Sequence, residues 1–139
     1  MKPASILIFA LAAALAGAQT PTMRQLMLDL IHPASNDIQL FINRGDSKDD
    51  AGWARVRRAA LTLSLAETTL AAPNANPDWT KDAQVLAAVG AAGYRAAQAK
   101  DITALATLAD SLDASCTNCH KQFRPNVFPR RAGPTGGSK

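Results

Sequence analysis

The run Cys116-Thr117-Asn118-Cys119-His120 constrains the fold of this 139-residue chain more than any other feature. It has the form C-x-x-C-H, the attachment signature of c-type haem, in which two thiols add to haem vinyl groups and the imidazole reaches the iron. On a helix, Cys116 and Cys119 share a face and His120 borders that face. The run therefore predicts a helix that presents two covalent attachment points and one axial ligand to a flat cofactor.

Three other roles for the two cysteines stay open from sequence. A disulfide across so short a gap would close a strained loop on a helix. A structural zinc site usually takes four Cys or His ligands, and the chain offers only the three residues of the run and His32, the only histidine outside it. A thioredoxin-like dithiol is expected near the start of a helix after a strand, whereas this pair follows a long helical pattern.

The first 18 residues have the form of a secretory signal peptide. Lys2 precedes an apolar run over residues 6–15, and Ala16-Gly17-Ala18 offers a small-x-small cleavage site. The run is short for a membrane span and no stop-transfer pattern follows it; an uncleaved anchor is the alternative. We expect export to the periplasm, with no stable membrane insertion after cleavage.

The exported part is the size of one domain, expected over residues 19–125, followed by a loose tail over residues 126–139. The net charge is +4, and no dense Lys/Arg run is interleaved with aromatic residues, so nucleic-acid binding is not expected. No carboxylate pair, nucleophile–base pair or phosphate loop suggests an enzyme.

Four amphipathic helices are predicted, over about residues 22–43, 49–72, 79–99 and between Asp101 and Pro125. Thr20, Asp78 and Asp101 are the expected N-caps of the first, third and fourth helices. No segment alternates with a period of two. The prediction is an all-α fold, an up-down antiparallel four-helix bundle with a covalent haem that fills a core poor in aromatic residues.

The first helix carries an apolar stripe whose phase is expected to survive Pro33. That proline removes one backbone hydrogen bond and crowds the carbonyl of Asp29, so a kink or two short helices in line are expected. The stripe consists of Met23, Leu26, Met27, Leu30, Ile31, Ala34, Ile38, Phe41 and Ile42.

Two features of the middle helices bear on a cofactor. Glu67 falls in the apolar seam of the second helix, where a buried carboxylate needs a partner such as an arginine or the indole of Trp53 or Trp79. The third helix is rich in Ala and Gly, which would allow close approach of a neighbouring helix or leave room for a flat cofactor.

On these residues the chain resembles class II c-type cytochromes, which include cytochrome c′ and its low-spin, methionine-ligated relatives. The resemblance is most specific over residues 116–124, which match the pattern C-x-x-C-H-x-x-aromatic-basic, and it extends to Arg24-Gln25-Leu26-Met27 in the first helix. Class I cytochromes c have the reverse order, with C-x-x-C-H near the amino end.

The resemblance implies one haem c per chain, held by Cys116 and Cys119 as thioethers with His120 as proximal ligand. Arg124 matches a basic position near the proximal imidazole, where it would tune the ligand; a solvated charge at the helix end is the alternative.

The distal side separates two functions. A first-helix Met is the sixth ligand in the low-spin relatives, and the matching residue is Met27, with Met23 one turn earlier as second candidate. A thioether ligand suits electron transfer, whereas an open iron would bind nitric oxide or carbon monoxide. His32 lies off the buried stripe and is expected at the surface or the kink, with bis-His ligation as a minor alternative.

The resemblance also bears on partners. An electron carrier would act with redox partner proteins, and the family often forms homodimers through its first two helices. Leu61 and Leu65 permit such a dimer. The functional prediction is therefore a periplasmic electron-carrying cytochrome, with a gas-binding haem protein second and a haem-free dithiol protein third.

Overall fold

The computed structural model describes residues 20–44, 48–72, 74 and 76–127, which contain helices and no strand. This confirms the all-α prediction. The predicted signal peptide and all of the predicted tail beyond Val127 lie outside the described residues. Within the described part of the chain, no helix combines the length and apolar character needed to cross a membrane.

The helices follow one another along the chain with short connections. They are α2 (Met23–Leu26), the π-helix η1 (Met27–Ile31), α3 (His32–Asn43), α4 (Asp50–Ser64), α5 (Ala66–Ala71), α6 (Pro77–Gln98), α7 (Ile102–Ala106) and α8 (Ala109–Phe123).

The first helical stretch begins close to the predicted residue, but its N-cap differs from the predicted one. Thr22, not Thr20, is the N-cap: its side chain accepts a hydrogen bond from the backbone of Gln25, and the Gln25 side chain accepts one from the Thr22 backbone at 2.8 Å. This reciprocal capping box satisfies two donors that would otherwise lack partners. Thr20 has no such residue three positions on.

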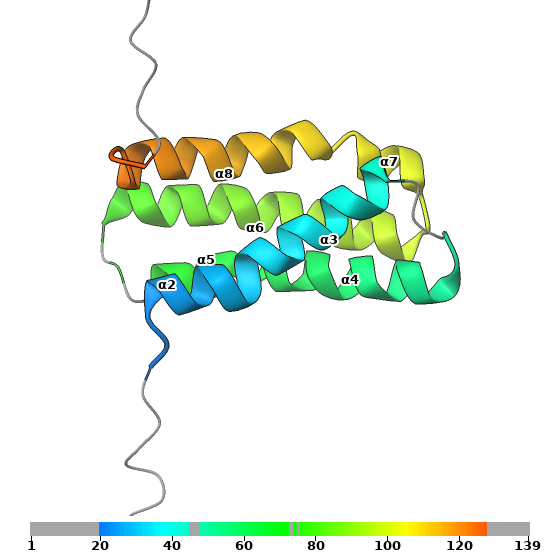
Figure 1. Cartoon of the computed structure of the whole chain (residues 1–139), viewed down its shortest axis with the longest axis horizontal. Coiled ribbons are helices and arrows are strands. Elements are labelled where there is room, and N and C mark those ends of the chain that lie inside the picture. Colours follow the sequence, from blue (N-terminus) through cyan, green and yellow to red (C-terminus); the bar gives the residue numbers. More distant parts are fainter. Residues whose placement is uncertain (1–19, 45–47, 73, 75, 128–139) are drawn as a thin grey trace, which may run out of the picture.

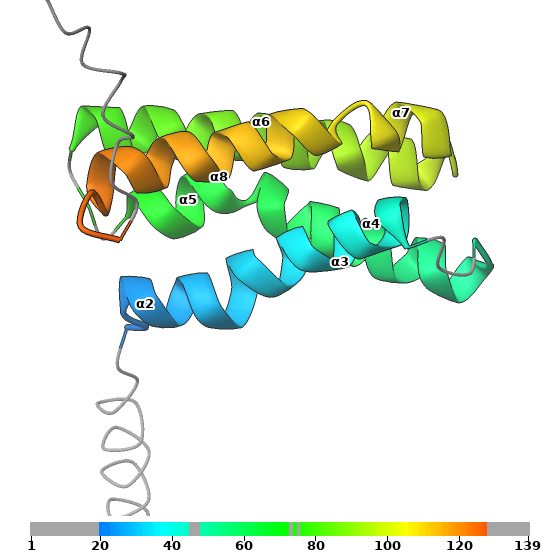
Figure 2. The same ribbon diagram turned by 45° about the horizontal axis from the view of Figure 1, so that its top comes forward.

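Pro33 is accommodated by a π-helical turn. The backbone N–H of His32 donates to the carbonyl of Met27, five residues back, and Pro33 then begins α3. A proline is tolerated in the first turn of a helix because its missing N–H has no obligatory partner there. The helix thus continues without the chain separating into two pieces, as Figure 2 shows.

The π-turn shifts the apolar stripe, which the sequence pattern did not predict. Leu26, Ile31, Ala34 and Ile38 are buried as expected, but Leu30 is 43% exposed. A π-turn places one extra residue in the helical repeat, so the residue that a continuous α-helix would bury beside Leu26 faces outward.

The second predicted helix is divided at Leu65 into α4 and α5, and its start at the N-cap Asp49 agrees with the prediction. The expectation for Glu67 is wrong. Its side chain is exposed and accepts a hydrogen bond from Gln84 Nε2 at 2.9 Å. The turn at Leu65 changes the phase of the helix, so the seam continues through the buried Ala66 and Leu70 instead.

Small residues of α6 bring it close to α4. A Cβ atom placed on Gly90 would lie 2.5 Å from the carbonyl carbon of Leu63 and closer still to the backbone nitrogen of Ser64. Only a glycine permits this approach of two backbones. The Ala/Gly-rich composition of α6 therefore serves helix packing at this point.

The caps of the last stretches were predicted in part. Asn76, not Asp78, caps α6, accepting from Asp78 and Trp79 backbone nitrogens, because the helix begins at Pro77. Asp101 caps α7 as predicted. The fourth predicted helix is interrupted between α7 and α8, and it ends at Phe123 before Pro125.

Successive helical stretches lie side by side and alternate in direction, as Figures 1 and 2 show. The principal contacts are those of α4 with α3 and α6, of α5 with α6, and of α6 with α8. The amino end of the first stretch and the carboxyl end of α8 therefore lie at the same end of the molecule. At the other end, Phe41 and Trp53 pack edge to face with centroids 4.8 Å apart.

Candidate functional site

A pocket of about 550 Å³ lies between the first helical stretch and α8, with α6 contributing to its lining. Its size is within the range of small-molecule and cofactor sites, about 300–1,000 Å³. It is lined by Met27, Leu28, Ile31, His32, Ser35, Gln39, Asn43, Leu70, Trp79, Asp82, Ala83, Leu86, Ala109, Asp110, Asp113, Ser115, Cys116, Cys119, His120 and Arg124.

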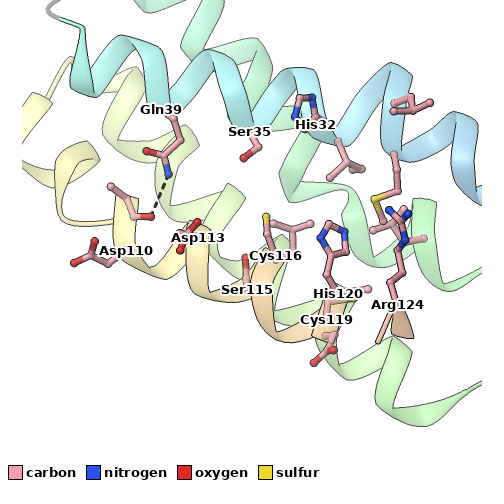
Figure 3. Close-up of a pocket in the computed structure, with 18 of the residues that line it drawn as sticks. His32, Ser35, Gln39, Asp110, Asp113, Ser115, Cys116, Cys119, His120 and Arg124 are labelled. Atoms are coloured by element: carbon pink, nitrogen blue, oxygen red, sulfur yellow. Dashed lines mark hydrogen bonds between the residues drawn. The ribbon is translucent and has the colours of Figure 1, made fainter. Parts of the chain in front are cut away.

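All three residues of the C-x-x-C-H run that carry chemistry line this pocket. Cys116, Cys119 and His120 come from the last two turns of α8 and are each partly buried. Figure 3 shows the Cys116 sulfur pointing toward Ser35 on α3, across the pocket, with His120 directed toward the same helix. The predicted common face of the three side chains is therefore present.

Both thiols are free, and both are held in the neutral form. Burial raises the pKa of Cys116, although hydrogen bonds with Ser115 and Ser35 act in the opposite direction. Burial is also the main cause that raises the pKa of Cys119 to about 11, and the carboxylate of Asp82 adds to it by its charge and by a hydrogen bond. Because the thiolate is the reactive form, we expect these thiols to react slowly with electrophiles in the folded chain.

Asp82, on α6, is a polar residue of the pocket that sequence reasoning missed. Its Oδ2 atom is buried and has no donor within hydrogen-bond distance, although the carboxylate interacts with the Cys119 thiol. A buried carboxylate oxygen of this kind is unfavourable unless a donor reaches it. The atom marks a place in the pocket wall where a bound group or water with a donor would be favoured.

His120 and Arg124 lie one turn apart at the end of α8, and Figure 3 shows them side by side. The Arg124 backbone N–H donates to the His120 carbonyl at 2.8 Å, and the Arg124 side chain is exposed. Burial lowers the pKa of His120, and the positive charge of Arg124 lowers it further. Both causes favour the neutral imidazole, which is the form that binds a metal.

Three side chains with ligating atoms come from the first helical stretch, and two of them line the pocket. Met27 is half-buried, contacts the core and lines the pocket. Met23 contacts the core as well but is not among the lining residues. His32 is exposed, as predicted, yet it also lines the pocket. Figure 3 shows His32 and His120 on the two facing helices.

The inner wall of the pocket is apolar and is fixed by Trp79. Its indole Nε1–H donates to the carbonyl of Leu70 at 2.8 Å, not to Glu67, and its ring packs edge to face against Phe123 with centroids 4.9 Å apart. Leu70 and Leu86 complete this buried surface. The orientation of the Trp79 ring is thus set by a buried hydrogen bond as well as by packing.

The far end of the pocket is polar. Gln39 Nε2 donates to the Ala109 carbonyl at 3.3 Å, linking α3 to the start of α8, and the exposed Asp110 and Asp113 stand beside it. An apolar inner surface with a polar, solvent-facing end suits an amphipathic cofactor.

The structure brings together Met27, Cys116, Cys119, His120 and Arg124, all of which were selected from the sequence. The donor set of two thiols, an imidazole and a thioether, in a pocket of this size, fits haem c. Asp82 and Trp79 were missed, since nothing local to either residue shows that it faces α8.

The alternative of a zinc site finds no support. Among the described residues, no three His, Cys, Asp or Glu side chains lie close enough together to hold a metal ion. The free thiols likewise give the disulfide alternative no support.

Comparison with known proteins found no matching family model, no matching curated protein and no matching solved structure.

Proposed function

We propose that this chain is an exported, monohaem c-type cytochrome of the class II kind, which carries one electron between redox partner proteins. One observation carries the proposal. The C-x-x-C-H side chains and Met27 line the same pocket of about 550 Å³ from opposite helices. A structural pair of cysteines would need neither the cavity nor a thioether on its other side.

In this function, Cys116 and Cys119 would hold the haem through two thioether bonds, and His120 and Met27 would be the ligands of its iron. A haem held in this way supplies one-electron exchange between ferric and ferrous iron. The four-helix bundle belongs to the proposal too: side-by-side stretches of alternating direction support it, and cofactor sites in such bundles are built from facing helices.

The remaining pocket residues set the environment of the iron. A Met thioether stabilises the ferrous state and raises the reduction potential. The Arg124 cation acts in the same direction, whereas the carboxylates of Asp82, Asp110 and Asp113 favour the ferric state. Leu86 and Trp79 exclude water from the inner wall.

Gas binding at an open iron is the second function considered from sequence. The presence of ligating side chains on the distal wall, Met27 above all, supports electron transfer instead. Homodimer formation stays a prediction; Leu61 and Leu65 are 44% and 52% exposed, so the surface it requires is available.

The attachment model is tested by producing the chain with haem-maturation machinery and counting thioether bonds. The native chain should retain haem after denaturation, and its pyridine haemochrome spectrum should show two saturated vinyl groups. Cys116→Ser and Cys119→Ser should each leave one thioether, and the double variant none. Thr117→Ser, inside the same run, is the control and should behave as native. Undiminished retention in the double variant would contradict the model.

A further inference from the structure

The π-turn brings two ligating side chains to the same wall of the pocket. Its hydrogen bond joins the His32 N–H to the Met27 carbonyl, so these two residues are neighbours one π-turn apart. Both line the pocket. Isolated π-turns within helices are uncommon and are frequent at functional sites.

An ordinary α-helix would separate these residues. At 3.6 residues per turn, positions five apart differ by roughly 140° around the helix axis. If His32 faced α8 in such a helix, Met27 would face away from it. The extra residue in the π-turn brings positions five apart nearly into line, and Pro33, which cannot donate to Asp29, is the sequence feature that favours this turn.

Of Met27 and His32, only Met27 is a ligand of the iron in the function proposed above. Met27 is half-buried against the core, which restricts its thioether. His32 is exposed and lies on the turn that follows, on the helix facing His120. A neutral imidazole is among the commonest ligands of iron in proteins.

We propose that His32 is an alternative distal ligand, which replaces Met27 on the iron when the thioether leaves. This inference rests on the proposed haem function. In the exchange, the bond from iron to the Met27 sulfur breaks and a bond to a ring nitrogen of neutral His32 forms, with no electron transferred and no net proton released. The protein thereby keeps six ligands on the iron in both arrangements.

Met27 and His32 would favour different oxidation states of the iron. A soft thioether favours ferrous iron, whereas a His–His pair gives a lower potential than His–Met. A peroxide that transfers one oxygen atom to Met27, and is itself reduced to water or an alcohol, would convert the thioether to a sulfoxide; the sulfoxide is a poorer ligand of the iron and would also leave it to His32. The exchange would thus protect the iron from binding external gases.

The test uses absorption and electron paramagnetic resonance spectra of the full, haem-loaded chain. Met27→Leu, which keeps the side-chain volume, should lose the weak red sulfur-to-iron band and remain low-spin through His32. Met27→Ala should do the same. The double variant M27L/H32Q should become high-spin, and added imidazole should return it to low-spin, which shows that the pocket is intact.

M27L/L28A is the matched control, since Leu28 lines the same wall and has no ligating atom; it should stay low-spin. A high-spin M27L with haem covalently attached would overturn the role of His32 and leave the cytochrome function standing. A native chain without any haem would overturn both.

Discussion

At the scale of single residues, burial is the main cause that raises the pKa of both thiols, and a different aspartate adds to it at each. The carboxylate of Asp82 raises the pKa of Cys119 by charge and by a hydrogen bond, whereas Asp113 raises the pKa of Cys116 by charge alone. The two aspartates come from α6 and α8 respectively. The pKa of each thiol can therefore be lowered separately, by replacing a different aspartate with a neutral residue.

Asp82→Asn should lower the pKa of Cys119 in the haem-free chain and speed its alkylation by iodoacetamide, leaving Cys116 nearly unchanged. Asp113→Asn should have the opposite preference. The reason is that the thiolate is the reacting species and loses a nearby negative charge in each variant. Alkylation rates at pH 8.5, resolved by peptide mass spectrometry, measure both. Equal acceleration of the two thiols by Asp82→Asn would contradict the assignment.

Protonation of His120 makes the folding stability of the haem-free chain depend on pH. Its pKa in the folded chain is lowered, so below about pH 6.5 the unfolded chain binds a proton that the folded chain resists. By linkage, this contribution to stability is fully present above pH 6.5 and is lost as pH falls through the folded pKa.

Arg124→Gln should raise the pKa of His120 and reduce this loss, since one of the two causes is removed. Burial remains, so the pKa should stay below its ordinary value. Nuclear magnetic resonance titration of the His120 ring in the haem-free chain measures the shift. Lys121→Gln is the control, because its charge is not among the causes; a larger shift in this variant than in Arg124→Gln would count against the account.

At the scale of helices, Gly90 and Gly93 lie one turn apart in α6 but have different neighbours. Gly90 lies against the backbone of Leu63 and Ser64, whereas a Cβ on Gly93 would meet Ala60 Cβ at 3.5 Å, an ordinary contact. The α4–α6 contact, the most extensive in the structure, therefore depends on Gly90.

Gly90→Ala should destabilise the fold by about 1–3 kcal/mol or more, because the two backbones must separate. Gly93→Ala should be neutral or stabilising by up to about 1 kcal/mol, since alanine is the better helix former. Urea unfolding of the two variants measures the difference. Equal stability of the two would mean that the close approach of α4 and α6 is not present in solution.

The π-turn at Met27–Ile31 has its own test through Pro33. Pro33→Ala restores an N–H that can donate to Asp29 and permits a continuous α-helix. Met27 would then rotate out of line with His32, so the sulfur-to-iron band of the haem-loaded chain should weaken. An unchanged band would show that tertiary packing, not Pro33, maintains the turn.

At the scale of the whole molecule, local sequence patterns predicted the approximate positions of the helices and the residues of α8 that line the pocket. The second helix starts close to residue 49 as predicted, Asp101 caps a helix as predicted, and the three side chains of the C-x-x-C-H run line one pocket. Met27 was selected through a family resemblance and lies across the pocket from them. These are features that a short stretch of sequence specifies.

What escaped prediction depends on helix phase and on contacts between distant segments. The π-turn exposes Leu30, and the break at Leu65 exposes Glu67, because each changes the phase of a stripe that was extended at 3.6 residues per turn. The position of Asp82 beside Cys119 follows from the packing of α6 on α8, which no pattern within either helix reveals.

The most direct test of the account is the absorption spectrum of the full chain produced with working haem-maturation machinery, in its ferric and ferrous forms. A covalently retained, low-spin haem with the weak red sulfur-to-iron band is the predicted result, since His120 and Met27 would fill both axial positions. A chain that leaves maturation without haem would contradict the cytochrome function altogether. A high-spin spectrum that shifts on addition of carbon monoxide would contradict distal ligation and make gas binding the function.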